Sequence, residues 1–174
     1  MQDLIKEGSF NTLLVISIFA ILFVAVFVDV KTGKIPNSFN GFALSCGLIY
    51  RVVLGGITGV WEGLLGVIIP ILGLIVLFAF GVVGAGDIKL LAGIGAFLGL
   101  DIVWVIMYSF LLCGIFGGIL ISVRLIKGLI GGEIRNILTG FLISKKQYTK
   151  VAFSVFILGG YVWYLLKGGL WNGI

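Results

Sequence analysis

Long runs of apolar residues, broken only by short polar stretches, dominate this sequence. The run 11–28 has about 18 residues, just enough to cross the hydrocarbon core of a bilayer as a helix. A chain in lipid must satisfy its backbone hydrogen bonds internally, in helices or in a closed barrel. Because the runs lack the period-two alternation of barrel strands, they predict an all-α, polytopic membrane protein.

The composition supports this class and excludes several others. Apolar residues make up 60% of the chain and charged residues only 11%, far from the balance of soluble domains. The absence of histidine removes the commonest metal ligand and general base. Cys46 and Cys113 both lie inside apolar runs and are far apart, which supports neither a zinc site nor a disulfide framework. We therefore expect no metal and no cofactor.

Polar residues divide the chain into six expected transmembrane helices within a single domain, 1–174. We place Asp101 in a turn between two spans rather than in a kink. Between the fifth and sixth spans, apolar residues recur every three or four positions among basic ones, which predicts an amphipathic segment on the membrane surface over 124–150. The expected spans are 11–28, 38–54, 64–83, 87–100, 102–123 and 151–166.

The basic residues predict the orientation in the membrane. Nine of the twelve lysines and arginines fall in the segments 29–37, 84–89 and 124–150. By the positive-inside rule these segments face the cytoplasm, and both termini then lie on the outer side of the cytoplasmic membrane. Since the basic residues flank spans, the net charge of +5 reports topology and does not indicate nucleic-acid binding. The expected surroundings are the lipid bilayer.

Two acidic residues stand out because ionisable groups near membrane depth are costly unless they serve a purpose. The topology puts Asp29 and Asp87 at the cytoplasmic ends of neighbouring helices. Two carboxyl groups that converge in a site of low dielectric do not both ionise cheaply, so one keeps its proton. Such a pair can activate water and protonate a scissile carbonyl. The positive helix N-terminus near Asp87 favours its ionised form, and the helix C-terminus before Asp29 favours a protonated Asp29. Because the two groups titrate as a pair, which acid holds the proton stays open at this point.

Each residue alone also fits a structural role. Asp87 fits a helix N-cap, and Asp29 fits a loop residue paired with Lys31 or Lys34. Lys89 fits a marker of the cytoplasmic side, and the glycines before Asp87 fit a simple turn. The combination of residues, set out next, favours the chemical interpretation.

Two short segments carry a recognisable pattern. The first, DVKTGKIPN, is an Asp followed several residues later by Ile-Pro-Asn, and the second, GAGDIKLLAGIG, contains Gly-x-Gly-Asp-x-Lys. Together they resemble the signature segments of the prepilin peptidases, the type IV leader peptidase family of membrane aspartic proteases. The resemblance implies that Asp29 and Asp87 are catalytic. The residues that match the remaining motif positions, and that we expect to shape the cleft, are Ile35, Pro36, Asn37, Gly84, Gly86 and Lys89.

The resemblance also implies a substrate. Such enzymes remove the short basic leader of type IV pilin-like precursors at the cytoplasmic membrane face, after a glycine and ahead of the hydrophobic helix. Larger members add an insertion with paired CxxC motifs and methylate the new N-terminus; this chain has neither feature and resembles the short, peptidase-only form. The pattern does not reveal the oligomeric state.

Two other interpretations remain. The same buried acids are compatible with a small cation or proton transporter or channel. A structural subunit of a secretion assembly would not need the acids at all. Intramembrane proteases of the presenilin type also contain Gly-x-Gly-Asp, but the Tyr-Asp span and the Pro-Ala-Leu motif that accompany it there are absent.

Overall fold

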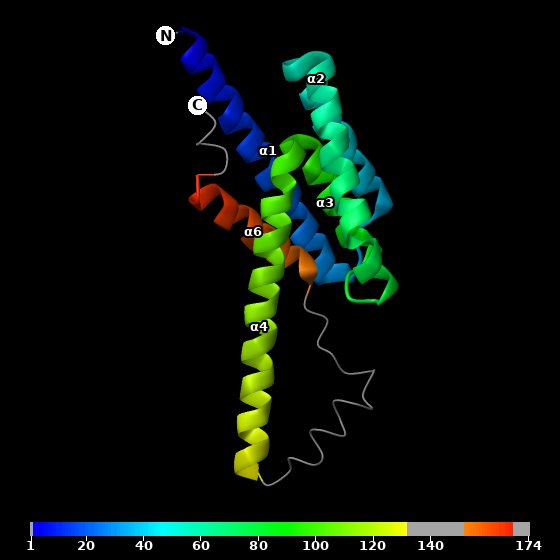
Figure 1. The fold of residues 1–174 in the computed structure, drawn as a ribbon, viewed down its shortest axis with the longest axis vertical. Helices are drawn as coiled ribbons and strands as arrows, with labels where there is room; N and C mark the ends of the chain where they lie inside the picture. Colours follow the sequence, from blue (N-terminus) through cyan, green and yellow to red (C-terminus); the bar gives the residue numbers. More distant parts are fainter. Residues whose placement is uncertain (1, 132–151, 169–174) are drawn as a thin grey trace.

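The computed structural model describes residues 2–131 and 152–168, which are helical throughout apart from short connections (Figure 1). The expectation of an all-α protein is confirmed for these residues. The elements in chain order are α1 (Gln2–Thr32), α2 (Asn37–Ala79), α3 (Ala85–Leu98), the 3-10 turn η1 (Gly99–Asp101), α4 (Ile102–Gly131) and α6 (Phe153–Leu166).

The segments predicted as the second and third spans form one element, α2, which reverses at Gly56. This glycine has φ 55° and ψ −138°, a conformation outside the helical region that residues with a side chain rarely adopt. Beyond it, Gly59 packs directly against the carbonyl group of Arg51, so the two limbs run back along each other. The predicted break at this point is therefore correct, but the predicted connection over 58–62 is helical.

Helix α3 lies at the centre of the bundle, between the two limbs of α2. Nearly all of its side chains after the first turn are buried. A Cβ atom on Gly47, in the first limb, would lie 2.7 Å from the Cβ of Ala96 in α3. Gly66, in the second limb, lies directly against the backbone of Gly95 in α3. Small residues allow helix backbones to approach closely in a membrane, where apolar burial alone does not drive helices together. The glycines of α2 thus fix the position of α3.

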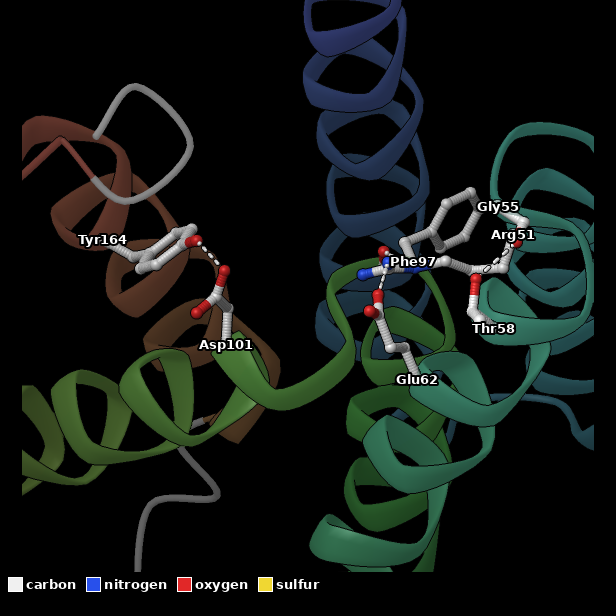
Figure 2. A network of polar contacts seen from close by, with 7 residues as sticks. All are labelled: Arg51, Gly55, Thr58, Glu62, Phe97, Asp101 and Tyr164. Carbon is white, nitrogen blue, oxygen red and sulfur yellow. Dashed lines mark hydrogen bonds and ion pairs between the residues drawn. The ribbon is translucent and has the colours of Figure 1, made fainter. Parts of the chain in front are cut away.

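A polar cluster closes the end of the bundle where α3 turns into α4 (Figure 2). The Nε atom of Arg51 donates to the carbonyl oxygen of Phe97 at 2.8 Å, and its Nη1 atom pairs with Glu62. The hydroxyl of Tyr164 on α6 donates to the carboxylate of Asp101 at 2.9 Å. The placement of Asp101 in a turn is confirmed, because it ends η1 between the two helices.

Several predicted boundaries are wrong because the helices run further than the apolar runs. Helix α1 continues through Asp29 to Thr32, so this acid lies in a helix and not in a loop. Helix α4 continues past Arg124 to Gly131, and its far end projects beyond the other helices (Figure 1). The rest of the predicted amphipathic segment, 132–150, lies outside the described residues.

Within the part of the chain that the structure describes, three segments are long and apolar enough to cross a membrane: Thr12–Thr32, Asn37–Ala79 and Ala85–Val123. Helix α6 is apolar but has only 14 residues. Large apolar side chains such as Phe23, Val53 and Ile57 point outward, as expected where the surroundings are lipid. Length and composition therefore show a helical membrane protein, but they do not show six separate spans.

The close contact between α2 and α3 predicts that the same substitution destabilises the protein at one glycine and not at another. In Gly66→Ala, the added methyl group collides with the Gly95 carbonyl, so we expect the free energy of unfolding to fall by about 1–3 kcal/mol. Gly73→Ala is the matched control on the same limb, because a Cβ there meets nothing within 4 Å. Thermal unfolding in detergent measures both; equal stability of the two variants would contradict the packing described.

Candidate active site

Asp29 lies in the last turn of α1, half-buried. The helix ends just after it because Gly33 adopts φ +68°, and the backbone N–H of Gly33 donates to the carbonyl oxygen of Asp29 at 2.7 Å. The side chain points to another part of the bundle: the hydroxyl of Ser154 on α6 donates to Oδ2 of Asp29 at 2.7 Å. The structural alternative, in which Asp29 pairs with Lys31 or Lys34, is therefore not what the structure shows: the described partner of the carboxylate lies on a distant helix.

Asp87 is the third residue of α3, and Gly84 is the N-cap of that helix. The N–H of Asp87 donates to the carbonyl oxygen of Gly84 at 3.1 Å, which closes the first turn of the helix. The structural alternative in which Asp87 is the N-cap is therefore not what the structure shows, because Gly84 occupies that position.

The glycine at position 84 leaves room for the Asp87 carboxylate. Its φ of −78° and ψ of 147° are open to any residue, so backbone freedom does not explain it. A Cβ atom on Gly84, however, would lie 3.0 Å from Oδ2 of Asp87. The missing side chain therefore lets the carboxylate fold back over the N-cap.

The structure brings Asp29 and Asp87 together from separate helices. The end of α1 and the start of α3 meet at the same end of the bundle, and the two carboxyl groups are close enough for their charges to interact. Both side chains are half-buried, which lowers the effective dielectric between them while leaving access to water. In residues 2–131 and 152–168, no three His, Cys, Asp or Glu side chains gather in a way that suits a metal ion.

The Ile-Pro segment forms the link between α1 and α2. Ile35 is buried, and Gly86 packs on it: a Cβ there would lie 3.7 Å from the Cβ of Ile35, an ordinary contact. Pro36 is the N-cap of α2, where its fixed φ of −61° suits a helix start, and its carbonyl accepts the N–H of Asn40 at 3.2 Å. The two motif segments are therefore in direct contact.

Two side-chain hydrogen bonds tie the segments to each other. The ammonium group of Lys89 donates to Oδ1 of Asn37 at 2.9 Å. The amide of Asn40 donates to the carbonyl oxygen of Gly86 at 3.3 Å. Lys89 therefore joins the start of α3 to the start of α2. This structural role comes in addition to the predicted role of Lys89 as a marker of the cytoplasmic side.

Sequence reasoning missed Asn40 and Ser154. Asn40 is buried and lies one helical turn from Asn37, so its place on the same face of α2 was a usable signal. Ser154 gave no such signal, because its partner is far away in sequence and an isolated serine in an apolar run has many possible roles.

Comparison with known proteins gives a family match. The model of the type IV leader peptidase family matches residues 16–123. This region includes both acids and both motif segments but ends before α6. No curated protein and no solved structure matches the chain.

The bond between Lys89 and Asn37 predicts energetic coupling of the two residues. In a double-mutant cycle with Lys89→Met and Asn37→Ala, we expect a coupling free energy of about 0.5–1 kcal/mol, because both side chains are exposed and water competes for the bond. The measurement is unfolding in detergent. Lys31→Met with Asn37→Ala is the control pair, since the Lys31 ammonium lies over the Phe27 ring and its effect should simply add.

Proposed function

Because the chain belongs to the type IV leader peptidase family, we propose that it is an aspartic endopeptidase that removes the short basic leader of pilin-like precursors. Asp29 and Asp87 are its catalytic pair. Membership of the family indicates a protease that acts on prepilin-type substrates. The observation that carries the assignment of residues is the meeting of these two acids, from α1 and α3, at one end of the bundle.

The pair supplies both proton transfers that amide hydrolysis requires. The ionised carboxylate takes a proton from a water molecule, whose oxygen attacks the carbonyl carbon of the scissile amide. The neutral carboxyl group gives its proton to the carbonyl oxygen. The acid that took the water proton then protonates the leaving nitrogen, and the C–N bond breaks. The other acid takes a proton back from one hydroxyl of the tetrahedral intermediate, so that the new carbonyl forms and the pair again holds one proton. A site of reduced dielectric keeps the two acids in different protonation states.

The remaining motif residues shape the floor of the cleft. Gly84 gives the Asp87 carboxylate its room, and Gly86 sits on Ile35. Pro36 starts α2, and the bond from Lys89 to Asn37 fixes the distance between α2 and α3. These contacts hold the two acids in register, since catalysis depends on geometry at the scale of about 1 Å.

The location of the site suits a substrate that is itself anchored in the membrane. The helix ends that carry the acids adjoin the basic segment around Lys31 and Lys34, which by the positive-inside rule faces the cytoplasm. In this arrangement the chain is a single domain of six passes in the cytoplasmic membrane, with both termini outside. The precursor's hydrophobic helix lies in the bilayer, and its cleavage site emerges at the depth of the two acids.

Substitution of either acid tests the proposal directly. We expect Asp29→Asn and Asp87→Asn each to lower kcat by on the order of 100- to 10,000-fold, because each removes one proton transfer. The measurement is cleavage of a pilin-like precursor by the purified protein. Asp101→Asn is the control: this acid lies at the opposite end of α3, and an amide oxygen still accepts the Tyr164 hydroxyl.

Full cleavage by either active-site variant would contradict the proposal. A transporter would instead be supported if the unsubstituted protein cleaves no precursor but moves protons or cations across proteoliposomes, and if either substitution abolishes that flux. Retention of all functions by both variants would support a structural subunit.

The two motif glycines give a second prediction. In Gly84→Ala the new methyl group pushes on Oδ2 of Asp87, so we expect kcat to fall on the order of 10- to 100-fold. Gly86→Ala adds the same methyl group against Ile35 at an ordinary contact distance and should keep most of the activity. Equal loss in both variants would contradict the role given to Gly84.

A further inference from the structure

Helix α6 contributes to the site although it lies outside the region that matches the family. Ser154 is in its first turn and is fully buried. Its hydroxyl donates to Oδ2 of Asp29 at 2.7 Å, across 125 positions of sequence. The match covers Asp29 but ends at residue 123, so Ser154 belongs to a part of the chain that the family match does not cover.

Other helical serines of this chain use their hydroxyl groups differently. Ser45, Ser109 and Ser122 each donate to the carbonyl oxygen four residues earlier in their own helix, at 2.6–2.9 Å. This local bond is the usual choice of a serine inside a helix. Ser154 is too close to the start of α6 to have a helical carbonyl four residues earlier. Its hydroxyl is therefore available for a distant acceptor, and the acceptor is Asp29.

The helix that carries Ser154 is held firmly by its neighbours. The ring of Phe153 lies 5.3 Å from that of Phe110 on α4, and Tyr161 lies 6.2 Å from Phe19 on α1. Further along α6, Gly160 packs directly on Ser109 of α4. A hydroxyl on such a supported helix turn has a fixed position, as a group that orients a catalytic side chain requires.

The first turn of α6 also brings the positive end of a helix towards Asp29, which adds to the attraction for a carboxylate. We infer that Ser154 is a positioning residue that holds the Asp29 carboxylate in the orientation needed to activate water. This inference rests on the proposed peptidase function. It makes α6 part of the active site, although α6 does not supply a group that reacts.

The test is a set of Ser154 variants in the full-length protein, assayed on a pilin-like precursor. We expect Ser154→Ala to lower kcat about 10- to 100-fold, the range for loss of a hydrogen bond to a charged group. The KM should not change, because Ser154 contacts Asp29 and not the substrate. Ser154→Thr keeps the hydroxyl and should restore most of kcat. Ser154→Cys has nearly the same size but a weak donor, so it should resemble Ser154→Ala.

Ser109→Ala is the matched control. It removes a hydroxyl from an equally buried serine, but one that bonds to its own helix, so kcat should stay within about twofold of the unsubstituted protein. Thermal unfolding of each variant in detergent shows whether it is folded. If Ser154→Ala unfolds, the comparison of Ser154→Cys with Ser154→Thr still decides the question.

The outcomes separate this inference from the proposed function. Normal kcat in Ser154→Ala or in Ser154→Cys, with Asp29→Asn inactive, would overturn the role of Ser154 and leave the peptidase proposal standing. Activity in Asp29→Asn would overturn both. A change in KM alone would also contradict a positioning role, because it would indicate a contact with the substrate.

Discussion

The direct backbone contact between Gly66 and Gly95 is the constraint on which the rest of this bundle depends. Lipid surrounds the helices with material as apolar as their own side chains, so close packing must supply the attraction that water supplies elsewhere. With both limbs of α2 against it, α3 has little freedom to slide or tilt. Because Asp87 lies in the first turn of α3, the same packing sets the height at which that carboxylate meets Asp29.

The polar contacts described above lie at the two ends of the bundle. At one end, Arg51 and Asp101 each have partners, Phe97 and Glu62 for the first and Tyr164 for the second (Figure 2). At the other end are the two acids of the candidate site. An enzyme that uses water as a reactant cannot bury its acids completely, and the end of a helix bundle offers partial burial together with access to water.

The sequence predicted the parts of the fold and site that depend on local chemistry. The all-helical class, the break at Gly56 and the turn at Asp101 followed from apolar runs, glycines and isolated charges. The catalytic pairing of Asp29 with Asp87 stays a prediction. Helix lengths were less predictable, because α1 stays helical through its polar last turn and α4 stays helical through its basic end. The hydrogen-bonding pattern of a helix tolerates polar residues, so hydropathy marks where lipid ends and not where the helix ends.

What the sequence determined by itself is which residues are candidates for chemistry, because carboxylates in an apolar chain and a Gly-x-Gly-Asp-x-Lys pattern are visible without coordinates. Only the tertiary structure decided what holds them: the bond from Ser154 to Asp29, the bond from Lys89 to Asn37, and the space that Gly84 leaves for Asp87. Each of these depends on a distance of a few ångströms between side chains or within one helix cap. Such distances arise from the packing of whole helices, which no local pattern of residues encodes.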